Sequence, residues 1–199
     1  MSLVIFMEKK EDLRIIKTRK ILYQTLIDLM TEKSFEEIKV SDICNRALIN
    51  RSTFYSHYAD KYELFSNYVN DLKDSLSEEL QKNKNINNTK EYYLEMLKLF
   101  LNHLEEKKDI YASIMKTNRN SIIMYMIYDT FKNDITKEIE KDDNNKNSII
   151  PSDFIAKFYL GCIFSIGMEI LENTNKYTKE ELIEYLNILI PKNLTKKQD

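Results

Sequence analysis

The stretch that decides the fold spans residues 41–61 and reads Ser-Asp-Ile-Cys-Asn-Arg-Ala-Leu-Ile-Asn-Arg-Ser-Thr-Phe-Tyr-Ser-His-Tyr-Ala-Asp-Lys. It predicts two short helices separated by a turn of about three or four residues. Ser41 is expected to cap the first helix, because a hydroxyl before an acidic first turn is a common helix start. Asn50 is expected to cap the second helix, which extends from Arg51 to His57 or Tyr58. Two helices joined by so short a turn are typical of a helix-turn-helix unit.

The second short helix has the composition of a surface that contacts DNA. Phe54 and Tyr58 are four residues apart, so both are expected to face the core. The other side chains are expected to point largely outward near the start of the helix, where exposed N–H groups favour phosphate. An arginine fork, short hydroxyls and a tyrosine tip suit base edges and backbone oxygens. These outward residues are Arg51, Ser52, Thr53, Tyr55 and His57.

Longer helices are expected on both sides of this unit. Upstream, residues 11–33 carry an apolar stripe at helical spacing, with basic residues crowded near its start. Downstream, Asp60 is expected to cap a long helix, with Glu63 completing a capping box. Four of the five arginines lie within the first 51 residues. This asymmetry favours nucleic-acid contact at the N-terminal end, with a chance distribution as the alternative.

Residues 35–43, Phe-Glu-Glu-Ile-Lys-Val-Ser-Asp-Ile, together with residues 47–61 resemble the DNA-binding domain of the TetR/AcrR family of transcriptional regulators. The most specific part of the resemblance is Thr53-Phe-Tyr-x-His-Tyr58 followed by Asp60-Lys61. The resemblance implies an all-α protein with a three-helix, helix-turn-helix DNA-binding domain at the N-terminus. Residues 9–70 are expected to form that domain, and residues 71–199 a helical regulatory and dimerisation domain.

The resemblance also implies roles for individual residues. Arg51, Ser52 and Thr53 correspond to positions that read bases in the family. Tyr55, His57 and Lys61 match positions that usually touch the DNA backbone. Ser41 at the start of the supporting helix and Asn50 at the turn complete the predicted DNA-binding set, which is Ser41, Asn50, Arg51, Ser52, Thr53, Tyr55, His57 and Lys61.

Two positions depart from the family pattern. The family commonly has Gly just before the aromatic residue at Phe35, where this chain has Ser34. It also commonly has Gly in the turn, where this chain has Leu48. A left-handed leucine costs about 1–2 kcal/mol. Either the turn therefore differs slightly, or burial of Leu48 in the core offsets the strain.

The composition excludes several classes of enzyme. The 199 residues include only two Gly and two Pro, and phosphate loops or nucleophile elbows need clustered glycines. The two histidines and the widely separated Cys44 and Cys162 form no metal-ligand spacing or disulfide framework. We therefore expect no catalytic residues, no metal and no cofactor. A β-sandwich or barrel would also need frequent Gly/Pro turns, so the depletion favours helices.

The bulk properties favour a cytoplasmic protein. The net charge is −2, and the longest uncharged run near the C-terminus, residues 158–168, has eleven residues. A membrane span needs about 20 apolar residues, so this run predicts a buried helix and no membrane association. The N-terminus has no basic region before its short apolar part, unlike a signal peptide.

The C-terminal two-thirds also predict helices. Thr89 is expected to cap one, Asn118 to begin another of about 22 residues, and Thr178 to open the last with a capping box. The helix at about 151–173 is apolar nearly all round, which requires a partner as well as a core. By the resemblance, this helix and the one at about 178–190 form a homodimer interface. A dimer would place two recognition helices on the half-sites of an inverted-repeat operator in double-stranded DNA.

Aromatic and methionine residues are dense in the middle helices. They fit an apolar pocket for a small-molecule inducer or, as the alternative, ordinary core filling. The candidate ligand-binding residues are Met96, Phe100, His103, Tyr111, Met124, Tyr125 and Tyr128. The sequence therefore predicts a DNA-binding transcriptional regulator, a repressor released from its operator by an inducer. The alternative is a coregulator of similar fold controlled by a protein partner.

Overall fold

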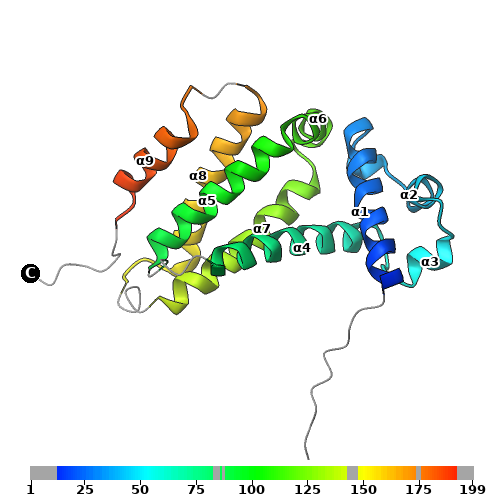
Figure 1. Ribbon diagram of the computed structural model, residues 1–199, viewed down its shortest axis with the longest axis horizontal. Coiled ribbons are helices and arrows are strands. Elements are labelled where there is room, and N and C mark those ends of the chain that lie inside the picture. Colours follow the sequence, from blue (N-terminus) through cyan, green and yellow to red (C-terminus); the bar gives the residue numbers. More distant parts are fainter. Residues whose placement is uncertain (1–12, 83–85, 87, 143–147, 174–175, 192–199) are drawn as a thin grey trace, which may run out of the picture.

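The computed structural model describes residues 13–82, 86, 88–142, 148–173 and 176–191. The predicted start of the DNA-binding domain at residue 9 lies outside them. The described elements are all helical, which confirms the all-α fold class (Figure 1). They are α1 (Leu13–Glu32), η1 (Phe35–Glu37), α2 (Val40–Ala47), α3 (Arg51–Tyr55), α4 (Lys61–Lys82), α5 (Thr89–Glu106), α6 (Lys108–Asn118), α7 (Ile122–Lys141), α8 (Ser152–Leu171) and α9 (Lys179–Leu189).

Helices α1 to α3, with η1 and the first turns of α4, form a small N-terminal unit at one end of the molecule (Figure 1). Its core is closed by apolar side chains that helical spacing places on inward faces. Phe35 of η1 lies 5.5 Å from the ring of Phe65 on α4, between ring centroids. The side chains with no exposed surface here are Leu22, Leu26, Phe35, Ile43, Phe54 and Leu64.

Helix α4 joins the N-terminal unit to the rest of the chain. Its 22 residues correspond to a length of about 33 Å. The predicted domain boundary after residue 70 falls inside this helix. Both halves of the molecule therefore share one continuous helix.

The remaining helices pack into a bundle. Helix α8 packs against α5, α6 and α7, and α9 packs on the outside against α5 (Figure 1). Helix α6 contacts α1 as well as α8, so it touches both the N-terminal unit and the bundle.

Helix α8 is apolar along most of its length. Within the described ranges it is the helix that is long and apolar enough to cross a membrane, by length and composition alone. Core helices of soluble proteins pass the same test. Ile155, Tyr159 and Ile163 of α8 are buried in the bundle, whereas Phe154 and Phe158 are exposed, so the predicted buried helix is buried on one face only.

Two predicted helix caps are confirmed. The Oδ1 atom of Asp60 accepts hydrogen bonds from the backbone N–H groups of Tyr62 and Glu63, both at 2.8 Å. The predicted capping box is wrong in its second half, because the Glu63 carboxylate accepts from the N–H of Ala59, one residue before the cap. The hydroxyl of Thr178 accepts from the N–H of Glu181 at 3.2 Å, and the Glu181 carboxylate accepts from the N–H of Thr178 at 2.8 Å. Both starts follow from local chemistry within four residues.

Three predicted helix starts are wrong. Helix α2 begins at Val40, because the Asp42 carboxylate accepts from the N–H of Lys39 at 3.1 Å; Ser41 is thus not its cap. Asn88 caps α5 by accepting from the N–H of Glu91, while the hydroxyl of Thr89 donates to Asp142 at 2.6 Å. The long helix expected from Asn118 begins after Ser121, whose hydroxyl accepts from the N–H of Ile123.

Candidate nucleic-acid interface and apolar chamber

The turn between α2 and α3 spans three residues, 48–50. Leu48 adopts the left-handed conformation, with φ 55° and ψ 40°, and the N–H of Ile49 donates to the carbonyl of Cys44 at 3.0 Å. Asn50 is extended and occupies the N-cap position of α3, as predicted, although its side chain makes no capping hydrogen bond. The connection is therefore a helix-turn-helix.

The structure contradicts both alternatives that the sequence left open for Leu48, a changed turn geometry and burial of the side chain. The side chain is 92% exposed, so burial in the core does not offset the cost of the left-handed backbone. The turn keeps the left-handed geometry that the family's usual glycine would adopt without strain. Leu48 therefore carries that strain uncompensated by any packing of its own.

Helix α3 presents a polar surface over an aromatic base. Phe54 and Tyr58 are buried, as predicted, whereas Arg51, Ser52 and Tyr55 are exposed. The other predicted contacts are less uniform. Asn50 is exposed, Thr53 and His57 are half-buried, and His57 lies beyond the last residue of α3, Tyr55, because the helix is shorter than predicted.

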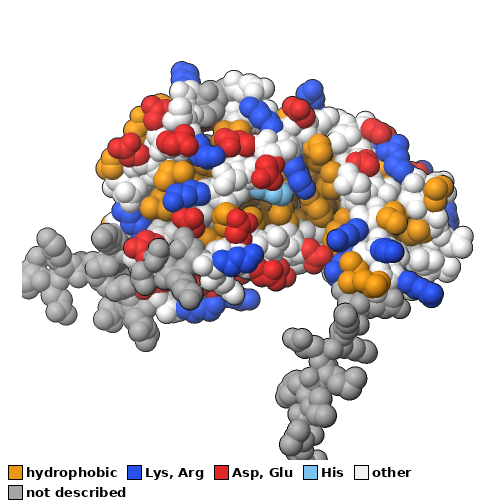
Figure 2. Space-filling view, viewed as in Figure 1, with side chains coloured by type: hydrophobic (Ala, Val, Ile, Leu, Met, Phe, Trp, Pro, Cys, Tyr) orange, Lys and Arg blue, Asp and Glu red, His pale blue; other side chains and the backbone are white. Residues whose placement is uncertain are grey.

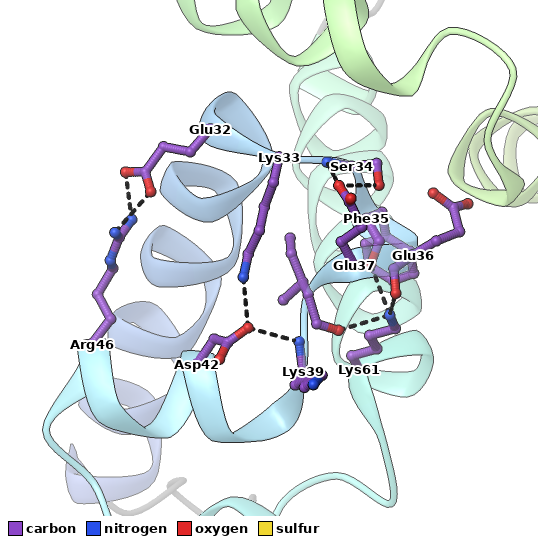
Figure 3. A network of polar contacts seen from close by, with 11 residues as sticks. Glu32, Lys33, Ser34, Phe35, Glu36, Glu37, Lys39, Asp42, Arg46 and Lys61 are labelled. Atoms are coloured by element: carbon purple, nitrogen blue, oxygen red, sulfur yellow. Dashed lines mark hydrogen bonds and ion pairs between the residues drawn. The ribbon is translucent and has the colours of Figure 1, made fainter.

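Lys61 has an unexpected set of partners in the N-terminal unit. Its Nζ donates to the backbone carbonyls of Phe35 at 2.7 Å, Glu36 at 2.9 Å and Ile38 at 2.7 Å (Figure 3). Partial burial lowers the pKa of Lys61. An ammonium group has three donors, and these three carbonyls use all of them. The lysine thus ties the start of α4 to the segment around η1.

Ion pairs attach α2 to the end of α1. Arg46 forms a bidentate pair with Glu32 at 2.7 and 2.8 Å, and Lys33 donates to Asp42 at 2.6 Å (Figure 3). The hydrogen bond from Lys33 and the N–H of Lys39 lower the pKa of Asp42. Exposed single pairs contribute little, but a bidentate arginine fork adds a defined geometry. Ser41, half-buried as the second residue of α2, lies beside this network.

An apolar chamber lies where α1, α4, α5, α6, α7 and α8 meet. Its volume is about 130 Å³. Four predicted ligand-binding residues line it, namely Phe100, His103, Tyr111 and Met124. The atoms exposed to it are apolar, as expected for a small-molecule site.

Three other predicted ligand-binding residues lie outside the chamber. Met96 is buried in the core, and Tyr125 is 65% exposed on α7. Tyr128 packs edge-on against Phe164, with ring centroids 5.6 Å apart, and only Phe164 lines the chamber. The sequence placed all three residues on the middle helices. Helical spacing alone does not show which face of a helix borders a cavity.

Lining residues from α1 and α4 were missed. Met30, Tyr68 and Leu72 line the chamber, and the sequence showed them only as parts of apolar helical stripes. Periodicity identifies a buried face, but two faces that close on a cavity have the same pattern as two that close on each other. No sequence signal would have separated them.

One hydrogen-bonded group of side chains lies at the chamber wall. The Nε2 atom of His103 and the hydroxyl of Tyr111 are 2.6 Å apart, and the hydroxyls of Tyr111 and Tyr68 are 3.4 Å apart. Burial, with a contribution from Lys107, lowers the pKa of His103 below its ordinary value. Burial raises the pKa of Tyr111. Both shifts favour the neutral forms of His103 and Tyr111 near pH 7.

The outer face of α8 and α9 carries exposed apolar side chains. Phe154, Phe158, Gly161 and Ser165 follow one another at helical spacing on α8 and are all exposed. A Cβ atom added at Gly161 would have no atom within 4 Å. Ile188 and Leu189 of α9 are 73% and 74% exposed.

Among the described residues, no three His, Cys, Asp or Glu side chains come together in a way that would hold a metal ion.

Family models match both halves of the chain. A model described as bacterial regulatory proteins of the tetR family matches residues 22–68, and one described as a transcriptional regulator C-terminal region, TetR_C_8, matches residues 91–192. The second match alone covers more than half of the chain. The first match contains the helix-turn-helix described above.

Individual proteins give a similar result. The chain is 40% identical over 63 residues to the HTH-type transcriptional regulator YxbF of Bacillus subtilis (strain 168), an alignment that covers 31% of this chain and 17% of that protein. It is 27% identical over 168 residues to the dhaKLM operon transcriptional activator DhaS of Lactococcus lactis (strain IL1403), covering 82% and 84%. A TetR-family regulator structure from Syntrophomonas wolfei shares the fold, with a TM-score of 0.64, 19% identity and coverage of 87% and 93%.

Proposed function

The chain belongs to the TetR family of DNA-binding transcriptional regulators, and from this we propose that it is a homodimeric repressor released from an inverted-repeat operator by a small-molecule inducer. We assign DNA binding to residues 9–70, and regulation and dimerisation to residues 71–199. The proposed role is non-enzymatic and cytoplasmic. The observation that carries it is the polar surface of α3, presented over the buried Phe54 and Tyr58.

We propose that α3 enters the major groove. Arg51, at the first position of the helix, has the planar fork that matches guanine O6 and N7, and Ser52 and Thr53 supply short hydroxyls. We assign a phosphate contact to Tyr55, whose side chain is exposed. The proposed set also includes Ser41, Asn50 and His57 at its edges.

The proposed role of Lys61 differs from the roles of the α3 residues. Its ammonium group already donates to three carbonyls, so a phosphate contact requires the release of one of them. We assign to Lys61 a positive charge near the DNA backbone together with a role in holding η1 against α4. The two roles make separate predictions, given in the Discussion.

The exposed face of α8 and α9 supports the dimer. Phe154 and Phe158 expose 62% and 64% of their surfaces, and the stripe continues through Gly161, where a second helix can approach closely. Burying such a face on its symmetry mate favours a two-fold dimer. A two-fold dimer presents two copies of α3 to two half-sites.

The chamber supports control by a small molecule. It is bounded on one side by α4 and α6, and both helices also contact α1 of the N-terminal unit. A ligand that favours one packing of these helices would change the placement of α3 by its differential affinity for the two states. This provides a physical route from the chamber to DNA.

A second candidate function is activation, because the relative DhaS is described as an activator. Control by a protein partner is the further alternative. Under that alternative, a partner bound to the C-terminal helices would change DNA affinity, and small molecules would not.

The decisive experiment selects preferred sites from a pool of random duplexes at moderate salt, using the full chain. The proposal expects an inverted repeat, with affinity that falls steeply as salt increases. A transcription assay on the selected site separates repression from activation. Equal affinity for selected and random duplexes would exclude the proposed function.

A further inference from the structure

The chamber offers no charged partner to a ligand. Among the described residues that line it there is no Asp, Glu, Lys or Arg. Transferring an unpaired charge from water into such a site is strongly unfavourable. A ligand with a net charge would therefore lose its hydration without compensation.

The size of the chamber limits the ligand. Apolar cavities of about 150 Å³ bind benzene, and the chamber has a volume of about 130 Å³. Four of its lining residues are methionines, Met30, Met115, Met124 and Met168, whose flexible side chains adapt to different shapes and favour contacts with aromatic rings. The lining thus suits one ring or a short branched chain.

The only polar groups at the described chamber wall form one cluster. Tyr68, His103 and Tyr111 satisfy one another, with the hydroxyl of Tyr111 3.4 Å from that of Tyr68 and 2.6 Å from the Nε2 atom of His103. Their polar atoms add no surface to the chamber, whose exposed atoms are all apolar. A ligand hydroxyl in the chamber would therefore lose its water without gaining a partner.

A surface hollow between α1, α4 and α5 leads to the same cluster. It shares Tyr68, Leu72, Leu76 and His103 with the chamber, and apolar side chains are visible in the hollowed face of Figure 2. Its rim carries three basic and three acidic residues, which are Arg19, Lys20, Lys107, Asp71, Glu79 and Glu106. Balanced charges select neither anions nor cations on entry.

We propose that the chamber binds a neutral, apolar molecule of about the size of benzene that carries no hydroxyl group. Only the assignment of this ligand as the inducer rests on the proposed function. The chemical class of the ligand follows from the lining and the volume of the chamber. Its test therefore measures binding directly, without DNA.

The first experiment compares matched probes on the full chain by calorimetry at pH 7. Benzene is neutral and apolar, phenol adds one hydroxyl, benzoate and benzylammonium carry one charge of either sign, and naphthalene is larger. We expect benzene to bind and to raise the melting temperature with concentration. Phenol should bind more weakly than benzene, and the two charged probes and naphthalene at least tenfold more weakly.

The second experiment locates the site. Met124→Trp places a large side chain in the chamber, and Met126→Trp makes the same change two residues away on α7, outside the lining. The chain contains no Trp, so fluorescence reports the new side chain alone. Met124→Trp should lower benzene affinity at least tenfold, and Met126→Trp should leave it unchanged. Ile127→Phe, which also fills the chamber, replaces Met124→Trp if that variant loses its helical circular dichroism.

The third variant tests whether the tyrosine hydroxyls take no part in binding. Tyr111→Phe should leave the preference for benzene over phenol unchanged. Failure of benzene to bind, equal affinity for phenol, benzoate or benzylammonium, tighter binding of naphthalene, or equal losses in the two Trp variants would overturn the proposal. Binding of neutral probes without release of operator DNA would keep the ligand class and remove the inducer role. A chain that binds the probes but no operator would contradict the proposed function alone.

Discussion

The side-chain oxygen of Asn118, the last residue of α6, accepts a hydrogen bond of 2.7 Å from the backbone N–H of Phe35 in η1. The amide nitrogen of Asn118 donates to the carbonyl of Met30 at 3.3 Å and to that of Ile114 at 3.0 Å. Asn118 has no exposed surface. One buried side chain therefore joins the N-terminal unit to a helix that lines the chamber through Tyr111 and Ile114.

Replacing this side chain should both destabilise and uncouple the protein. Asn118→Ala leaves the N–H of Phe35 buried without an acceptor, so we expect the free energy of unfolding to fall by about 1–3 kcal/mol in urea titrations. The effect of inducer on operator affinity should also decrease. Asn120→Ala, two residues away and exposed, is the matched control and should change neither. Full stability in Asn118→Ala would contradict the assigned role.

Relief of the strained turn should stabilise the protein. Leu48→Asn keeps a side chain that tolerates the left-handed conformation, and we expect the free energy of unfolding to rise by about 1 kcal/mol. Leu48→Ala retains a Cβ atom in that conformation, so it should give little change. Equal melting temperatures of the Leu48→Ala and Leu48→Asn proteins would contradict this prediction.

Arg51 and Lys61 should affect DNA binding in different ways. Arg51→Ala should cost about 1–3 kcal/mol of discrimination at one base position and leave stability unchanged. Lys61→Ala should weaken binding to every duplex alike and also lower the free energy of unfolding, since three carbonyls lose their donor. Site selection and urea titration on both variants provide the measurements. A Lys61→Ala protein as stable as the parent would show that these contacts matter little.

His103 should make stability depend on pH. Burial, then Lys107, lower its pKa in the folded protein below the ordinary value of 6.5, with Glu106 opposing them. Below about pH 6.5 the unfolded chain binds a proton more readily than the folded chain, so stability falls as the pH decreases towards the folded-state pKa. His103→Gln should reduce this loss between about pH 7 and 5. His57→Gln, a control outside the bundle, should retain it.

The outer face of α8 should control the oligomeric state. Phe158→Lys places a charge in the centre of the exposed stripe and should shift sedimentation from dimer towards monomer, with weaker operator binding as a consequence. Ile21→Lys, which changes an apolar residue on α1 that is 47% exposed, should leave the dimer intact. An unchanged dimer in Phe158→Lys would place the interface elsewhere.

Features that depend on neighbours in the chain were predictable. The burial of Phe54 and Tyr58, the caps at Asp60 and Thr178, and the helical class all follow from spacings of about four residues. The predicted start of α2 was wrong, because the Asp42 carboxylate accepts a hydrogen bond from the N–H of Lys39 and the helix begins one residue before Ser41.

Features that depend on distant segments were not predictable. The three acceptors of Lys61 lie 23 to 26 residues upstream, and two partners of Asn118, Phe35 and Met30, lie more than 80 residues upstream. The composition of the chamber likewise depends on which faces of α1 and α4 the bundle covers. Such contacts are set by tertiary packing, which periodicity in a single sequence does not encode.

The uncompensated strain at Leu48 has a consequence for the divergence of this protein over generations. A typical point mutation destabilises a domain by about 1 kcal/mol, and natural chains stand only a little above the stability they need. Replacing Leu48 by a residue that tolerates the left-handed conformation should raise the free energy of unfolding by about 1 kcal/mol. The side chain lost in that change is 92% exposed. The turn therefore holds a reserve that lineages can use to tolerate otherwise harmful changes in the neighbouring α3, and so to acquire new operator sequences.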